Sequence, residues 1–522
     1  MRESLTRIGA IIRTEFFFRF RRTTAMITLL AVAATVYLII PDISTGRTLM
    51  HVNNARVLYN SAAVAVGTVV FCTILLSIVG FYIVSNSLRR DILTRTGYIL
   101  AASPVTSTEL IVGKFFGSVL YLTGIMATYM ISAMVMFLIR GESALEPLVF
   151  LSTYFVFVMP VVFFCAAAAI AFESLPLLSG RIGDVIFFFV WAATFSIPVA
   201  LADHASLSSG IFKSLDVVGM LPIIGKFQEQ FHDAAVSIGF TEFDPALKPV
   251  LFNGISWTWD LLLQRCSTLL LPVLLLILAR IWFHRFDPTR IKSSARNRKR
   301  SVFEKLRHLG KPVTRLFQKY TIGGNSFASS IRADVLMTVM LSPFVLVAMV
   351  VCVIFSLSVN IVTLRSVTLP VIIVVVVIVL SDLTTRDDSS GMQSLLFTAP
   401  RIKSRYVFWK FFSALFITLC FTTIPIIQLV LEIPRIAVSL CIGSVLLAAC
   451  AVGFGVLTGS RKLFVAIFLM LLYIGMNAKN VPVFDFAGIL GAATTGVQSM
   501  YGAIAIGIMV VAYFRHHVRA NV

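Results

Sequence analysis

The chain has 522 residues, of which 58% are hydrophobic and 13% charged, and its formal net charge is +20. This much apolar surface exceeds what one water-soluble core can bury, so the composition excludes an ordinary soluble protein and indicates one that is solvated by lipid. The basic residues lack the interleaved stacking aromatics of single-strand binders, so we expect no nucleic acid among the partners of this chain.

Apolar runs long enough to cross a bilayer recur throughout the sequence. About 20 helical residues cross the roughly 30 Å of hydrocarbon. The expected spans are 25–41, 62–86, 114–139, 148–172, 183–201 and 266–283, followed by 339–359, 367–381, 406–431, 435–458, 462–477 and 498–514. These runs lack the alternation of barrel strands. The expected fold is an all-α polytopic membrane protein with about twelve transmembrane helices in two six-helix repeats, together with amphipathic interface helices.

An amphipathic helix is expected ahead of the first span in each half. Isoleucine and phenylalanine recur at helical spacing through residues 8–20, opposite Arg13 and Glu15. This pattern is typical of a helix that lies on the membrane surface. Arg332 and Asp334 repeat Arg13 and Glu15 at a separation of 319, and they also lead into a span. The match predicts a second interface helix in mid-chain.

The segment between the second and third spans is also repeated. Five positions match at one constant separation of 296, and they are Leu100 and Leu396, Pro104 and Pro400, Lys114 and Lys410, Phe115 and Phe411, and Phe116 and Phe412. Duplicated membrane units place equivalent sites about a pseudo-two-fold axis, which is common in transporters. We therefore expect a first half at 1–285, a basic cytoplasmic linker at 286–324 and a second half at 325–522.

A third match lies between the fifth and sixth spans of each half. Asp216 and Gly219 correspond to Asp485 and Gly488 at a separation of 269. Both segments are apolar, contain glycine and are too short to cross the bilayer. This pattern predicts re-entrant or interfacial half-helices on the outer side.

Charge placement predicts the orientation of the chain. Lysine and arginine accumulate in short cytoplasmic loops. Under the twelve-span count the basic clusters at the head, after the even-numbered spans and in the linker all fall on one side. We expect a multi-pass protein of the cytoplasmic (inner) membrane with both termini cytoplasmic and with the linker attracted to anionic lipid.

The order of these features resembles that of a known transporter family. An interface helix precedes the first span, and the pattern Leu100-Ala-Ala-Ser103-Pro104 is followed by Glu109-Leu110 and Gly113-Lys114-Phe115. Together with the outer half-helices, this resembles type-two ABC exporter permeases. The second half departs from the family pattern, because Arg401, Lys403 and Arg405 replace a neutral and acidic stretch and Trp409 replaces the glycine.

The resemblance implies a permease that is driven by separate ABC ATPase subunits on the cytoplasmic side. The segment between spans two and three would be the coupling helix that docks on the ATPase. The implied docking charges are Arg89, Arg90, Asp91, Arg95 and Glu109 in the first half and Asp382, Arg386, Asp387, Asp388 and Arg401 in the second. The implied coupling segments also include Pro104, Lys114, Pro400 and Lys410. A solvated loop whose arginines only fix topology is the competing interpretation.

No ATP-binding loop is expected in this chain. Such a loop needs Gly-x-x-x-x-Gly-Lys followed by Ser or Thr. The three Gly-Lys pairs are followed by Phe115, Phe227 and Pro312, and none has the upstream glycine. We therefore expect no enzyme activity and no cofactor here, with ATP and magnesium bound by the partner ATPase.

Other chemistry has little support in the sequence. The seven cysteines form no closely spaced pair, so neither a zinc site nor a disulfide framework is indicated. Glu229, His232 and Asp233, with His204 further away, are candidate metal ligands, but polar loops contain such clusters by chance, so we expect no metal site there. A membrane-embedded enzyme would need converging carboxylates or histidines, and the sequence suggests none.

The alternative function is an ion-coupled secondary transporter with a duplicated bundle. Such transporters carry ionisable residues deep in the membrane, whereas the carboxylates here lie near span ends. The aliphatic and Phe-rich spans suit a hydrophobic or amphipathic substrate. Lipid-facing helices require the same composition, so the sequence leaves the substrate open.

Overall fold

The computed structural model describes residues 2–175, 178, 181–202, 215–231, 236–283, 327–341, 344–392, 396–398, 402–459, 461–477 and 482–521. The chain divides into two compact units, Met1–Pro288 and Thr289–Val522, and each unit is described by itself. The expected linker at 286–324 lies outside the described residues, as do Pro400 and Arg401.

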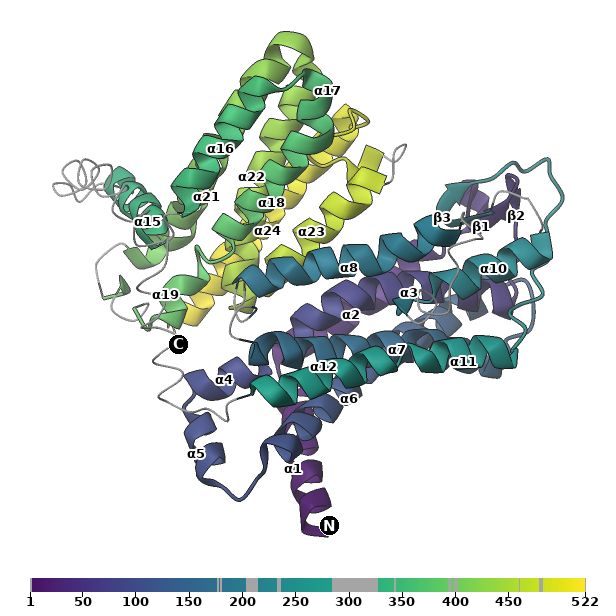
Figure 1. The fold of residues 1–522 in the computed structure, drawn as a ribbon. Coiled ribbons are helices and arrows are strands. Elements are labelled where there is room, and N and C mark those ends of the chain that lie inside the picture. The colour runs from purple at the N-terminus through teal and green to yellow at the C-terminus, as the bar shows by residue number, and fades with distance from the viewer. Residues whose placement is uncertain are drawn as a thin grey trace. The chain divides into compact units, whose positions relative to one another are not determined.

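The first unit is a helical bundle (Figure 1). Its long helices are α1 (Arg2–Phe20), α2 (Thr23–Ile39), α3 (Ser61–Val84), α6 (Ser107–Arg140), α7 (Pro147–Ser174), α8 (Arg181–Ala202), α11 (Trp259–Ser267) and α12 (Leu270–Trp282). Two short helices, α4 (Ser87–Leu93) and α5 (Thr96–Ala102), connect α3 to α6. Helices α3 and α7 pack against each other and form the core, since most of their side chains are buried.

Local sequence signals explain where the central helices of this unit begin. Thr106 caps the first turn of α6, because its hydroxyl accepts from the Glu109 amide while the Glu109 carboxylate accepts from the Thr106 amide. This reciprocal pair is a capping box. Pro147 occupies the first turn of α7, where a missing amide hydrogen does not weaken the helix.

A small sheet lies at the opposite end of the first unit from α4 and α5 (Figure 1). It contains β1 (Arg47–Val52), β2 (Ala55–Arg56) and β3 (Val236–Glu242) in the order β2-β1-β3, and both pairings are antiparallel. Helix α10 (Met220–Phe231) belongs to the same end. Asn53 and Asn54 both have positive φ and form the tight turn between β1 and β2. We did not expect this sheet, so the fold is predominantly helical rather than all-α.

The second unit is also a helical bundle (Figure 1). Its helices are α15 (Phe327–Leu341), α16 (Phe344–Ser358), α17 (Ile361–Thr363), α18 (Leu369–Leu380), α19 (Thr385–Ser389), α21 (Ile402–Glu432), α22 (Pro434–Thr458), α23 (Lys462–Asn477) and α24 (Thr495–Asn521). A π-helical turn, Leu364–Thr368, joins α17 to α18. Most side chains of helix α22 are buried, and it packs against both α21 and α24.

The length and composition of the helices identify a multi-pass membrane protein. Among the described residues, eight helices are long and apolar enough to cross a membrane, or up to ten if two bent pairs each form one span. The bent pairs join α1 to α2 at 71° and α15 to α16 at 91°. The runs expected at 183–201 and 462–477 coincide with α8 and α23, whose apolar parts are shorter than 18 residues. The expected twelve spans therefore exceed the count that the helices themselves support.

Candidate functional site

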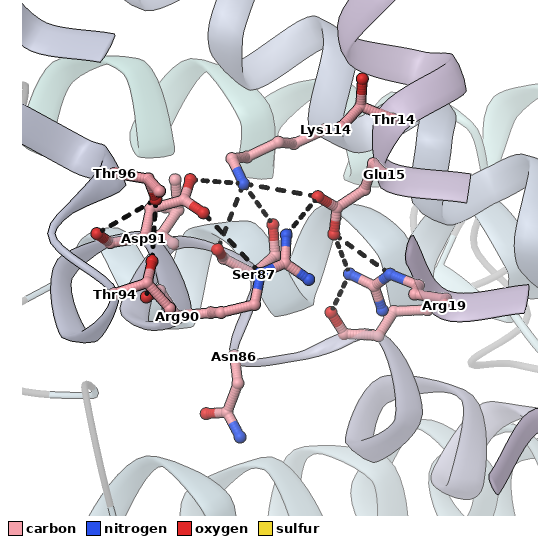
Figure 2. Close-up of polar contacts among 12 residues, drawn as sticks. Thr14, Glu15, Arg19, Asn86, Ser87, Arg90, Asp91, Thr94, Thr96 and Lys114 are labelled. Carbon is pink, nitrogen blue, oxygen red and sulfur yellow. Dashed lines mark hydrogen bonds and ion pairs between the residues drawn. The ribbon is translucent and has the colours of Figure 1, made fainter. Parts of the chain in front are cut away.

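A buried cluster of charged side chains joins α1, α4 and α6 in the first unit (Figure 2). The Nζ atom of Lys114 lies 2.7 Å from Asp91 Oδ2 and 3.5 Å from Glu15 Oε2. It also donates to the carbonyl and hydroxyl oxygens of Ser87. The side chains of Glu15 and Lys114 are 4% and 3% exposed, so protein groups, and not water, surround this ammonium.

Two arginines complete the cluster around Glu15. Arg19 Nη2 lies 2.6 Å from Glu15 Oε1, and Arg90 Nη2 lies 2.6 Å from Glu15 Oε2. Arg19 also donates to the backbone carbonyls of Ile83 and Val84 at the end of α3. The cluster therefore connects α1 to the C-terminal end of α3, to α4 and to α6.

The electrostatics of the cluster keep Glu15 ionised. Burial raises the pKa of this carboxyl, but the positive charges of Arg19, Lys114 and Arg90 outweigh burial and lower the pKa to about 2. Removing one member of a buried charge pair leaves the other uncompensated, which typically destabilises a protein by about 3–5 kcal/mol. The charges of the cluster therefore depend on one another, and together they connect elements that are distant in sequence.

Two glycines on α6 allow α1 to approach closely. A Cβ atom at Gly113 would lie 2.7 Å from the side chain of Ile11, and one at Gly117 would lie 2.8 Å from Glu15 Cβ. Larger residues at these positions would push α1 away from α6. The glycines therefore place the Glu15 carboxylate within reach of Lys114.

The N-terminus of α4 is held by a carboxylate from α7. Glu173 accepts hydrogen bonds from the backbone amides of Asn86, Ser87, Leu88 and Arg89. Unpaired amides at the start of a helix carry partial positive charge and favour an anion. This contact fixes α4 to the end of α7, a connection that sequence inspection missed because Glu173 resembles an ordinary span-end carboxylate.

The far end of the α4–α5 segment is also attached to α1. Arg7 Nη1 donates to the Pro104 carbonyl at 2.9 Å and lies 3.9 Å from Glu109. Since Glu15 holds Arg90 near the other end, α1 contacts both ends of the segment. The segment is therefore attached to α1 at both ends, in addition to its contacts with α6 and α7.

The same positions form a buried cluster in the second unit. Lys410 Nζ lies 2.9 Å from Asp334 Oδ1 and 2.7 Å from Asp387 Oδ2. Arg386 pairs with Asp334, and the Tyr406 hydroxyl donates to Asp387. Arg386 and Asp387 follow Arg90 and Asp91 by 296 residues, and Asp334 follows Glu15 by 319. Positions that correspond by these separations thus carry the same types of charge and pair with one another in both units.

The two clusters differ in composition. Thr338 stands 319 residues after Arg19 and accepts a hydrogen bond from Arg386 Nη1 at 3.0 Å. Trp409 and Ser413 occupy the positions 296 residues after Gly113 and Gly117. Three cations meet two carboxylates in the first cluster, whereas in the described part of the second unit two cations meet two carboxylates.

The residues expected in the coupling segment of the first half fall into two groups. Asp91 and Lys114 are buried in the cluster, and Glu109 is buried in the α6 cap. Arg95 and Pro104 are exposed. Tyr98 and Ile99 on α5, which we did not single out from the sequence, are 45% and 72% exposed. The accessible surface of this segment is therefore apolar as well as basic, and Asp91 belongs to its internal support.

The remaining second-half residues are placed only in part. Asp382 stands 296 residues after Asn86 and pairs with Arg461 at 3.2 Å. Asp387 lies in the buried cluster, while the side chain of Asp388 is outside the described residues. On α1 and α15, Arg13 and Arg332 are both exposed. Glu15 and Asp334, in contrast, are buried members of the clusters.

The outer match in the first unit is a tight, buried turn. Asp216 accepts hydrogen bonds from the amides of Gly219, Met220 and Leu221, and Arg265 Nη1 donates to the Asp216 carbonyl at 2.7 Å. Burial raises the pKa of the Asp216 carboxyl, while Arg265 and the three amides oppose that rise. Gly219 has φ +83°, which favours glycine. The turn leads directly into α10.

In the corresponding segment of the second unit, an aspartate again accepts hydrogen bonds from several backbone amides. Asp485 accepts from the amides of Leu490, Ala492 and Ala493, and Gly488 has φ +72°. This segment forms turns after the short 3-10 helix Pro482–Phe484, so the expected half-helix is absent from the described residues here. A carboxylate can satisfy several backbone amides without continuing a helix.

A comparison of the chain with protein families, with curated proteins and with solved structures finds no match.

Proposed function

We propose that this chain is the permease subunit of an ATP-driven ABC exporter, which couples ATP hydrolysis by a separate ATPase subunit to movement of a substrate out of the cytoplasm. The observation that carries the proposal is the α4–α5 segment. Its apolar residues Tyr98 and Ile99 are exposed, its charged residues Arg90 and Asp91 pair with α1 and α6, and its first amides bond to α7. A segment that exposes apolar side chains and is held by the helices behind it suits docking of a protein partner better than a solvated loop does.

The proposed role of the buried clusters is to transmit movement. A coupling element must pass a displacement of the partner to the spans, and a flexible loop would absorb that displacement. Lys114 joins the start of α6 to α4, and Glu15 joins both to α1. A push on α5 would therefore reach α6 and α1 together.

The recurrence of the cluster in the second unit supports a duplicated architecture. In this proposal, one chain supplies two six-helix halves with about twelve spans in total. Each half has a cytoplasmic coupling segment, so the protein lies in the inner membrane with both termini cytoplasmic. The second segment would dock differently, because its basic residues and Trp409 depart from the first.

The energy source in this proposal belongs to a partner. The sequence lacks the Gly-x-x-x-x-Gly-Lys-Ser/Thr loop, so ATP and magnesium would bind to the ATPase subunit. Proton coupling through Glu15 is disfavoured, because a carboxyl with a pKa of about 2 takes up no proton at neutral pH. The substrate in this proposal is hydrophobic or amphipathic.

The test uses the full chain expressed together with its candidate ATPase subunit. Ile99→Asp places a charge on the proposed docking surface, and Leu247→Asp places one on an exposed residue of the loop that follows β3. We expect Ile99→Asp to abolish co-purification of the ATPase and transport-coupled ATP hydrolysis, and Leu247→Asp to leave both intact. Transport that survives ATP depletion and stops when the ion gradient collapses would instead identify a secondary transporter.

A further inference from the structure

Three exposed arginines surround two exposed phenylalanines at the C-terminal end of α1. The guanidinium carbons of Arg13 and Arg21 lie 5.8 and 5.3 Å from the centre of the Phe17 ring. That of Arg22 lies 4.3 Å from the centre of the Phe18 ring. Phe17 and Phe18 are 38% and 40% exposed. Charge and exposed apolar surface therefore occur together near the end of this helix.

The carboxylate nearest to these arginines in the sequence, that of Glu15, already pairs with other cations. Glu15 is buried and paired with Arg19, Arg90 and Lys114. Within the described ranges, no carboxylate lies within ion-pair distance of Arg13, Arg21 or Arg22. Burial and the neighbouring cations Arg90 and Arg19 lower the pKa of Arg22. An anion from outside the chain would balance this charge.

The position of the patch indicates where that anion comes from. α1 bends by 71° into the apolar helix α2 immediately after Arg22. Met26 and Leu30, one and two turns into α2, are highly exposed, as expected for side chains that face lipid. The arginines thus stand where an apolar helix begins, which is the level of phospholipid head groups.

We propose that Arg13, Arg21 and Arg22 form a binding site for the phosphate groups of anionic phospholipids, and that lipid bound there steadies the buried cluster through Phe18. The Phe18 ring contacts both Arg22 and Arg90, since the Arg90 guanidinium carbon lies 4.0 Å from its centre. Arg90 in turn pairs with Glu15. A phosphate on Arg22 therefore restrains a ring that packs on a member of the cluster. This site does not depend on the proposed transport function.

Binding is tested with the purified full chain in nanodiscs of phosphatidylcholine, with and without phosphatidylglycerol. Native mass spectrometry counts the lipids that remain bound. Each interfacial arginine gives on the order of a fivefold preference for an anionic lipid. We expect Arg21→Gln/Arg22→Gln to lose about 25-fold in preference for phosphatidylglycerol. The matched control, Arg2→Gln/Lys248→Gln, removes two exposed charges elsewhere and should keep the preference.

Two results would overturn the binding site. One is equal retention of phosphatidylglycerol by the Arg21→Gln/Arg22→Gln variant and the wild type. The other is full competition by millimolar inorganic phosphate or by an acidic peptide, which would identify a soluble ligand or a protein partner in place of the membrane. Retention that resists both competitors supports the lipid.

The link to the cluster needs a separate measurement. Hydrogen exchange of the α4 amides should slow severalfold when phosphatidylglycerol is present. Phe18→Leu keeps the apolar surface but removes the ring between Arg22 and Arg90, so it should retain lipid and lose this slowing. Exchange that does not respond to lipid in the wild type, or that responds equally in Phe18→Leu, would contradict the link.

Discussion

Lys114 and Lys410 stand 296 positions apart, and each places its ammonium 2.7 Å from an aspartate that directly follows an arginine. Each lysine also lies close to an acidic residue of the preceding amphipathic helix, Glu15 at 3.5 Å and Asp334 at 2.9 Å. Lys410 is fully buried and Lys114 nearly so. The lysine thus pairs with the same two kinds of acidic residue in each unit, and these pairs lead to several predictions.

Replacing Lys114 by methionine should strongly destabilise the first unit. The change leaves Asp91 and part of the charge of Glu15 buried without their ammonium, which typically costs about 3–5 kcal/mol. Thermal unfolding in detergent measures the effect. Lys226→Met removes an ammonium whose partner Glu229 is largely exposed, so its expected cost is below about 1 kcal/mol. Equal losses for the two variants would show that the cluster adds no special stability.

Reversing the charge at Asp91 should disrupt folding rather than only partner docking. Asp91→Lys places a second ammonium beside Lys114 inside the protein. The double variant Asp91→Lys/Lys114→Asp should recover a measurable part of the loss, and a double-mutant cycle gives the coupling energy. Arg95→Glu is the matched surface change, because Arg95 is exposed, and it should leave thermal stability unchanged. Additive losses from Asp91 and Lys114 would argue that the two side chains do not interact.

Acid should weaken the contact between α1 and the rest of the first unit. The pKa of Glu15 is about 2 in the folded chain and 4.5 as its ordinary value. Because the folded pKa is the lower one, the stabilisation is complete above about pH 4.5 and is lost as the pH falls toward 2. Stability measured between pH 6 and pH 2.5 should fall less steeply in Glu15→Gln than in the wild type. Parallel curves would contradict this assignment.

Adding a methyl group at Gly219 should destabilise the outer turn. A Cβ atom there would lie 2.9 Å from the Phe157 ring, and the φ of +83° disfavours a side chain. The expected cost is about 1–3 kcal/mol in thermal unfolding. Gly124→Ala is the matched control, because Gly124 lies inside α6 with open space around it, and it should be neutral or slightly stabilising. A neutral Gly219→Ala would mean that the turn relaxes without cost.

The sequence was informative where the pattern is local. The long apolar runs predicted the helices, and the match of Arg13 and Glu15 with Arg332 and Asp334 predicted a helix at each place, which are α1 and α15. The contact between Glu15 and Lys114 joins residues 99 positions apart, and no periodicity reveals such a pairing. Asp91 was therefore assigned to docking, although its carboxylate is buried against Lys114.

Two other features were missed for different physical reasons. The Asn53-Asn54 pair is a recognisable hairpin signal, but β1 is short and its partner β3 lies almost 190 residues further along the chain. Glu173 carries no signal at all, because its role depends on four backbone amides instead of on side chains. Exposure of Tyr98 and Ile99 likewise follows from how α5 is held away from the bundle.

The carboxylate of Glu173 also links any movement of α7 to the start of α4. Because a single side chain at the end of α7 accepts from four consecutive amides, the start of α4 has little freedom to slide past α7. A tilt of α7 would therefore pull on the start of α4 through these hydrogen bonds. Shortening this residue to aspartate would uncouple the two helices mechanically while leaving the charge in place.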